Sequence, residues 1–107
     1  MSILKAEVPL ASPLEAVKDA DVVITDAWTS MGHEEEAEAR APYFKGFQVN
    51  SELLKAATED VMVLHCLPCH RNEEITPEIL EEHADEIFDE SENRLHAQKA
   101  VLVKLIK

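Results

Sequence analysis

Two short apolar runs rich in β-branched residues dominate the hydrophobic pattern of this chain. Val22 to Thr25 and Val61 to His65 each hold consecutive apolar positions, which is typical of strands buried in a parallel sheet. Glu86 to Asp89 predicts a further strand, and the alternation of apolar and polar residues from Ile3 to Val8 predicts a short edge strand. The chain therefore offers up to four strands.

Helical patterns lie between and after these runs. Ser12-Pro13-Leu14-Glu15 predicts a helix start, because a serine N-cap, a proline at the first position and a glutamate at the third form a capping box. Four more helices are predicted: His33 to Arg40, Ser51 to Ala57, a short one after Thr76-Pro77-Glu78, and Glu92 to Ile106. Strands that alternate with helices at this spacing predict a single α/β domain with a parallel sheet over residues 1–107.

The acidic composition of the chain argues against some classes of binding partner. The 107 residues carry 22 acidic and 10 basic side chains, and a net charge of −12 argues against binding to nucleic acid or to an anionic membrane. No apolar run approaches the roughly 18 residues of a membrane span, and the first ten residues lack the layout of a signal peptide. We therefore expect a cytoplasmic protein, in which Cys66 and Cys69 do not form a disulfide.

Polar and reactive side chains follow the two clearest strands. His65-Cys66-Leu67-Pro68-Cys69-His70 ends one of them, and Asp26 to Gly32 ends the other. The carboxyl ends of parallel strands lie at one edge of a sheet, and ligands of open α/β sheets bind there. The sequence therefore predicts a site at this edge.

The residues alone leave the chemistry of the Cys-x-x-Cys-His segment open. Its spacing is that of covalent haem attachment, but this needs an exported protein; it also suggests a thioredoxin-like thiol pair. His65, Cys66, Cys69 and His70 provide enough ligands for zinc, although adjacent residues at a strand end point in opposite directions. A half-buried free thiol beside a surface histidine is the simplest interpretation, and Arg94 taken alone is typical of a solvated surface residue.

Three motifs in order resemble one family. Asp26-Ala27-Trp28-Thr29-Ser30-Met31-Gly32, His65-Cys66-Leu67-Pro68 and Glu92-Asn93-Arg94-Leu95-His96-Ala97-Gln98-Lys99-Ala100 closely resemble the C-terminal third of ornithine carbamoyltransferases. Gln48-Val49-Asn50 and Arg71-Asn72-Glu73-Glu74 fit this family too. An aspartate carbamoyltransferase would be expected to have proline at position 66, so Cys66 favours ornithine as the amine.

The resemblance implies a fold and a reaction. The fold is a partial doubly wound, Rossmann-like parallel sheet of three to four strands with flanking helices and a C-terminal helix. The reaction transfers a carbamoyl group from carbamoyl phosphate to L-ornithine, giving L-citrulline and phosphate in arginine biosynthesis. It needs no cofactor and no metal.

The resemblance also implies roles for residues of the amine side. Asp26 would accept hydrogen bonds from the ornithine α-ammonium, and Ser30 with the backbone of Met31 would hold the amino-acid head group. Cys66 and the backbone carbonyl of Leu67 would lie against the reacting nitrogen.

Three further residues complete this expected site. Arg94 would stabilise charge on the carbonyl oxygen of carbamoyl phosphate. His65 and Pro68 would support the site, and the peptide bond before Pro68 would be cis.

The resemblance finally implies a partial domain. The carbamoyl-phosphate domain of the family, with its Ser-x-Arg-Thr-Arg motif, has no counterpart in this sequence. We expect the chain to be inactive alone, and we expect homo-oligomers because the Val22 strand and the side of the last helix with Leu102, Leu105 and Ile106 would lack partners. A self-associating module without a ligand is the alternative.

Overall fold

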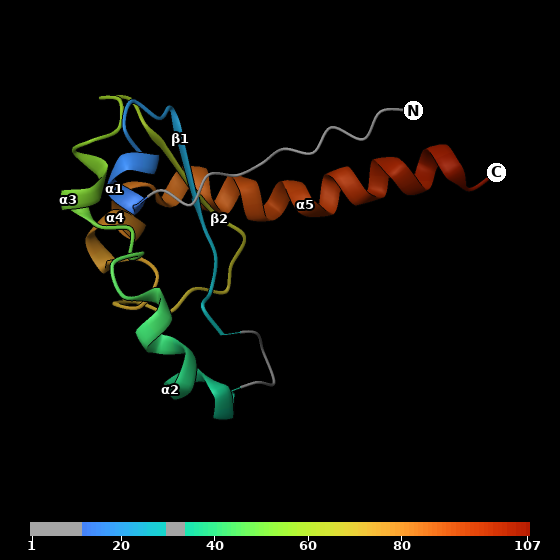
Figure 1. The fold of residues 1–107 in the computed structure, drawn as a ribbon. Helices are drawn as coiled ribbons and strands as arrows, with labels where there is room; N and C mark the ends of the chain where they lie inside the picture. The colour runs from blue at the N-terminus through green and yellow to red at the C-terminus, as the bar shows by residue number, and fades with distance from the viewer. Residues whose placement is uncertain (1–11, 30–33) are drawn as a thin grey trace, which may run out of the picture.

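The computed structural model describes residues 12–29 and 34–107. Figure 1 shows two strands with helices around them and a long C-terminal helix that extends away from the rest. The elements in chain order are α1 (Pro13–Ala16), β1 (Val22–Thr25), the 3-10 turn η1 (Glu34–Glu36), α2 (Ala37–Arg40), the 3-10 turn η2 (Ala41–Phe44), α3 (Ser51–Leu54), β2 (Met62–His65), α4 (Pro77–Glu82) and α5 (Ala84–Leu105). The predicted strand at Ile3 to Val8 lies outside the described residues.

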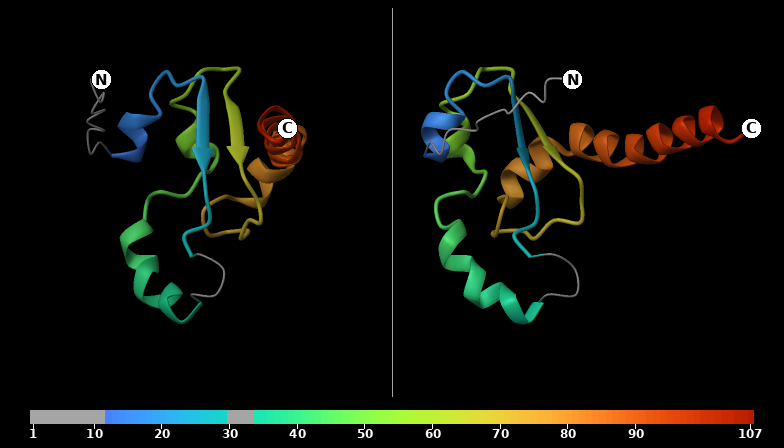
Figure 2. Two further views of the ribbon diagram at one scale, coloured as in Figure 1. Left: turned by 90° about the vertical axis from the view of Figure 1, so that its right-hand side faces the viewer. Right: turned by 45° about the vertical axis from the view of Figure 1, so that its right-hand side comes forward.

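The sheet is parallel, as the sequence predicts. β1 and β2 pair in a register that joins Val22 to Met62 and Thr25 to His65. The left view of Figure 2 shows β1 and β2 side by side with α5 on the far side of β2. On that side the backbone N–H of Val63 donates to the Glu86 carboxylate at 2.9 Å, so a side chain of α5 satisfies a backbone donor of β2.

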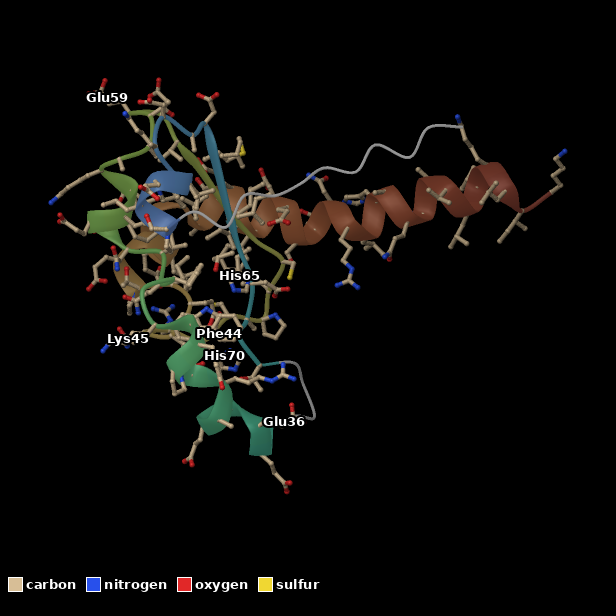
Figure 3. All side chains as sticks on the ribbon, in the orientation of Figure 1. Glu36, Phe44, Lys45, Glu59, His65 and His70 are labelled. Atoms are coloured by element: carbon tan, nitrogen blue, oxygen red, sulfur yellow. The ribbon has the colours of Figure 1, made fainter. Side chains whose placement is uncertain are left out.

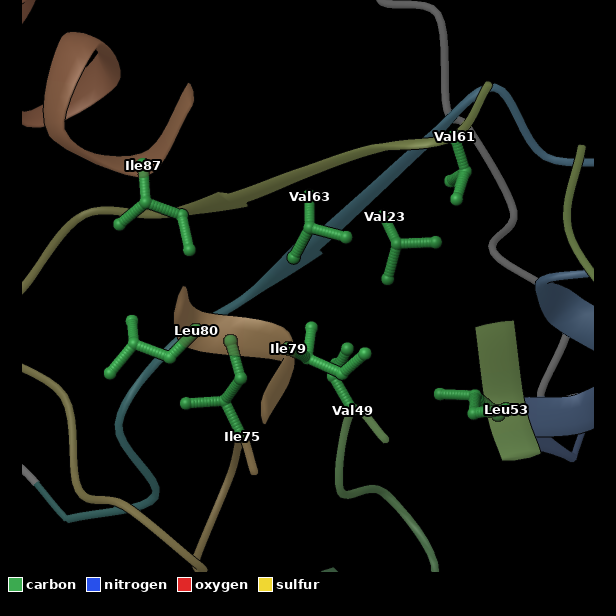
Figure 4. Close-up of a cluster of buried hydrophobic side chains, with 9 residues drawn as sticks. All are labelled: Val23, Val49, Leu53, Val61, Val63, Ile75, Ile79, Leu80 and Ile87. Carbon is green, nitrogen blue, oxygen red and sulfur yellow. The ribbon is translucent and has the colours of Figure 1, made fainter. Parts of the chain in front are cut away.

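The core lies between the sheet, α3, α4 and the first turns of α5. Val63, Ile75 and Ile87 are fully buried and come from three different segments. Figure 4 shows the whole cluster: Val23, Val49, Leu53, Val61, Val63, Ile75, Ile79, Leu80 and Ile87. Because Ile75 belongs to the segment between β2 and α4, this core also fixes the path of the chain that leaves the sheet edge.

The starts of α1, α3 and α4 lie where the sequence predicts helices. Ser12 and Glu15 form the capping box of α1. The Asn50 side chain accepts from the Leu53 N–H at 2.9 Å at the start of α3, and Pro77 opens α4.

The prediction of a strand from Glu86 to Asp89 is wrong, because these residues lie inside α5. Two apolar residues between two acids do not distinguish a strand from a buried helical turn. Here Asp85 and Glu86 in the first turn suit the positive end of the helix dipole, and α5 itself covers the edge of β2 where a third strand would pair. The sheet of the described residues therefore has two strands instead of three or four. No helix in residues 12–29 and 34–107 combines the length and the apolar character needed to cross a bilayer.

Candidate active site

The two strands bring Asp26 and Cys66 together. Each residue directly follows a strand end, and the register that pairs Thr25 with His65 makes them neighbours. The Cys66 thiol donates to Asp26 Oδ1 at 3.3 Å, and the Ala27 N–H donates to the same oxygen at 2.7 Å. A carboxylate and a thiol therefore lie side by side at the predicted edge of the sheet.

The surroundings of Cys66 favour its neutral form. Burial raises the pKa of the thiol above its ordinary value, and the hydrogen bond to Asp26 raises it further. The negative charges of Asp26 and Glu90 act in the same direction, while a backbone hydrogen bond at Cys66 opposes them. The thiol therefore keeps its proton at neutral pH and is the hydrogen-bond donor to Asp26.

His65, labelled in Figure 3, is the last residue of β2 and is fully buried. Its Nε2 is 2.9 Å from Glu74 Oε1, and the Leu67 N–H donates to its Nδ1 at 2.9 Å. Glu74 is also fully buried, and its Oε1 accepts a second hydrogen bond from the His70 N–H at 2.7 Å. Both ring nitrogens of His65 therefore have hydrogen-bond partners, and one of these partners is the backbone of Leu67.

The Leu67-Pro68 segment has the backbone that the resemblance implies. The peptide bond between the two residues is cis. Leu67 also has a φ of +52°, which lies in the left-handed region that branched residues rarely adopt.

The geometry around the two cysteines bears on the metal and thiol alternatives. Ligand atoms of Asp26, His65 and Cys66 lie within 4.8 Å of one another, but both His65 nitrogens already have hydrogen-bond partners. Cys69 does not belong to this group. Both cysteines are free, no helix begins at them, and the raised pKa of Cys66 is the opposite of what a thioredoxin-like thiolate needs.

Arg94 lies on the exposed face of α5. Glu90, whose charge raises the pKa of Cys66, precedes it by four residues, so the two side chains project from the same face one turn apart. Within residues 12–29 and 34–107 the guanidinium makes no hydrogen bond to Asp26 or Cys66. Ser30 and Met31 lie outside the described residues. The structure therefore joins Asp26, Cys66, Leu67 and His65, and Arg94 does not belong to this set of contacts.

A hollow of about 400 Å³ lies next to Asp26 on the open side of β1. Trp28 and Phe44 stack at its edge with ring centroids 5.4 Å apart. Its lining is mainly apolar: Pro13, Ala16, Val17, Val23, Ile24, Thr25, Asp26, Ala27, Trp28, Phe44, Phe47, Val49 and Leu53. Asp26 lines the hollow and Cys66 does not.

Sequence reasoning missed two acids of the site, Glu74 and Glu90. Glu74 belongs to a segment that fits the family pattern, yet nothing in the sequence shows that its carboxylate is buried. Glu90 precedes the predicted helix, which began at Glu92. It acts on the thiol from α5, because this helix begins at Ala84 and includes Glu90.

Comparison with known proteins agrees with the three motifs. Residues 4–105 match the family described as aspartate/ornithine carbamoyltransferase, Asp/Orn binding domain. The ornithine carbamoyltransferase of Archaeoglobus fulgidus is 60% identical over 94 residues, which cover 88% of this chain and 31% of that protein.

Solved structures give the same result. The anabolic ornithine carbamoyltransferase of Campylobacter jejuni has a TM-score of 0.82 at 48% identity, over 87% of this chain and 31% of that one. The enzyme of Pyrococcus furiosus has a TM-score of 0.78 at 52% identity, over 92% of this chain and 32% of that one. The chain spans about a third of the length of these relatives, and it belongs to the aspartate/ornithine carbamoyltransferase family through the Asp/Orn-binding domain.

Proposed function

We propose that this chain supplies the ornithine-binding side of an ornithine carbamoyltransferase site. The observation that carries the proposal is the hydrogen bond between Cys66 and Asp26 across the ends of two parallel strands. The full reaction is the transfer of a carbamoyl group from carbamoyl phosphate to the side-chain amine of L-ornithine, giving L-citrulline and phosphate. Relatives that match this chain over most of its length are named ornithine carbamoyltransferases.

Each residue has a role that its chemistry permits. The side-chain amine of ornithine has an ordinary pKa near 10.4 and must lose a proton before it attacks the carbamoyl carbon. Asp26 holds the α-ammonium, while the Leu67 carbonyl and the neutral Cys66 thiol orient the amine nitrogen. Arg94 stabilises the charge that develops on the carbamoyl oxygen, and Ser30 with Met31 holds the head group. Positioning and electrostatics then supply most of the rate.

The protonation state of Cys66 fits orientation and not covalent catalysis. A thiolate is the nucleophilic form of cysteine, and the raised pKa of Cys66 disfavours this form. No covalent step through Cys66 is therefore part of the proposal, and no cofactor enters it.

Turnover needs more than this chain. The relatives are about three times as long. The resemblance implies that the residues that bind carbamoyl phosphate belong to the part of the family's sequence that this chain does not match. We expect the isolated chain to bind L-ornithine weakly and to form citrulline only when the remaining N-terminal part of such an enzyme is added.

Isothermal titration with L-ornithine tests the proposal. Asp26→Asn is expected to weaken binding about tenfold to a hundredfold, because a hydrogen bond between charged groups is lost. L-Norvaline, which lacks the side-chain amine, is expected to bind more weakly than L-ornithine. Asp60→Asn is the matched control, since Asp60 is an exposed aspartate before the opposite end of β2. The absence of heat at millimolar L-ornithine would favour the alternative, a self-associating module without a ligand.

A further inference from the structure

A buried series of hydrogen bonds runs from Glu74 through His65 to the backbone of Leu67. Glu74 and His65 are both 0% exposed. Glu74 Oε1 is 2.9 Å from His65 Nε2, and His65 Nδ1 is 2.9 Å from the Leu67 nitrogen. The series thus ends on the residue whose carbonyl the proposed function places against the amine nitrogen of ornithine.

The donors along this series determine where the imidazole proton lies. A backbone N–H only donates, so Nδ1 of His65 must be the acceptor in its bond with Leu67. The proton of the neutral ring then lies on Nε2 and is donated to Glu74 Oε1. Because a carboxylate has no proton to donate, Glu74 selects the one tautomer that leaves Nδ1 free for Leu67.

Leu67 needs such support. Its φ of +52° is disfavoured for a branched residue, and such a conformation persists where surrounding contacts fix it. The hydrogen bond from its N–H to His65 fixes one end of the residue. The position of its carbonyl, and of the preceding Cys66, depends on this backbone.

Hydrogen bonds hold both the backbone around Glu74 and one oxygen of its carboxylate. The Val49 N–H donates to the Glu74 carbonyl at 2.8 Å, and Gln48 Nε2 donates to the carbonyls of Asn72 and Glu73 at 2.9 Å each. The His70 N–H adds a bond to Oε1 at 2.7 Å, whereas Oε2 is buried without a hydrogen-bond partner, 3.8 Å from His70 Nδ1. The segment before α3 therefore anchors the acid that orients His65.

We infer that Glu74 is a positioning residue for the amine side of the site. It keeps His65 in the tautomer with the proton on Nε2, and His65 in turn holds the Leu67 backbone so that the Leu67 carbonyl and the Cys66 thiol present a fixed geometry to the amine nitrogen. The role in ornithine binding rests on the proposed function. The tautomer of His65 is a property of the chain alone.

Nitrogen NMR of the histidine rings at pH 8 tests the inference without a ligand. The wild-type chain is expected to show His65 protonated on Nε2 and bare on Nδ1. Glu74→Met removes the acceptor, so His65 should populate both tautomers and the Leu67 amide should exchange about three- to tenfold faster. Glu74→Gln should restore both signals, because the amide oxygen can accept from Nε2.

A second histidine–glutamate pair provides the matched control. Glu92 Oε1 lies 3.3 Å from His96 Nε2 on the exposed surface of α5, so Glu92→Met should leave the signals of His65 and Leu67 unchanged. Protonation of wild-type His65 on Nδ1 would overturn the inference, as would unchanged Leu67 exchange in a folded Glu74→Met chain. If Glu74→Met does not fold, the wild-type tautomer and the Glu74→Gln spectrum decide.

Ligand titrations separate this inference from the proposed function. Glu74→Met should lose the preference for L-ornithine over L-norvaline that the wild type shows. A wild-type chain with His65 protonated on Nε2 and no affinity for L-ornithine would overturn the proposed function and leave the tautomer assignment standing. A wild-type chain that binds L-ornithine but has His65 protonated on Nδ1 would overturn only the role of Glu74.

Discussion

Two acids and burial set the protonation state of the Cys66 thiol. The hydrogen bond to Asp26 and the charges of Asp26 and Glu90 add to the effect of burial and raise the thiol pKa. A raised pKa in the folded state means that the protonated thiol stabilises the fold at neutral pH. This contribution is complete below the ordinary thiol pKa and is lost as the pH rises through the folded value.

Asp26→Asn should shift the titration of Cys66 to lower pH. The substitution removes the negative charge beside the thiol and leaves a neutral amide oxygen, a weaker acceptor, so more thiolate exists at pH 8. In a Cys69→Ser background, the pH profile of the reaction with an aromatic disulfide should move down, with up to about a tenfold gain in thiolate per pKa unit. A profile that stays in place, or moves up, would contradict the electrostatic account, and Asp60→Asn controls for the loss of one charge.

The pairing of Asp26 and Cys66 could be predicted because parallel strands end at one edge of the sheet. Glu74 could not be predicted as a buried acid, since its burial depends on how residues 48–50 hold the segment after β2. The role of Arg94 stays a prediction. Arg94 lies on α5, which begins eight residues before the predicted start at Glu92.

At the scale of elements, Ile87 and Phe88 show how α5 packs where the sequence predicted a strand. Ile87 is 0% exposed and belongs to the core, while its neighbour Phe88 is 61% exposed. The sequence placed β1 and β2 to within one residue, because β-branched runs between polar turns allow few alternatives. The short segment from Glu86 to Asp89 fits a strand and a helix equally well. In the structure it is helical, and Glu86 contacts β2 through the N–H of Val63.

Ile87→Ala should destabilise the chain by about 2–5 kcal/mol, because it leaves a cavity under the sheet. Phe88→Ala removes a larger side chain but an exposed one, and should cost less than about 1 kcal/mol. Urea unfolding followed by circular dichroism gives both values. Equal losses in the two variants would contradict the packing of α5, in which Ile87 is buried and Phe88 is exposed.

At the scale of the whole molecule, two apolar surfaces lack a covering element among the described residues. β1 has β2 as its one strand partner there, and on β1 Ile24 is 69% exposed. The C-terminal half of α5 extends from the body of the molecule (Figure 1), and Leu105 on it is 74% exposed. An unpaired strand edge and an apolar helix surface both favour association.

We therefore expect the isolated chain to form dimers or larger assemblies. Sedimentation velocity should show a mass above the 12.0 kDa of one chain that rises with concentration. Leu105→Glu should lower it by placing a charge on the exposed apolar side of α5, whereas Ser91→Glu, on the partly buried first half of the same helix, should not. Addition of the N-terminal part of a relative should also dissociate the assemblies if it covers the same surfaces. A single 12.0 kDa species at all concentrations would show that these surfaces do not drive association, and the apolar lining of the hollow beside β1 would then need another explanation.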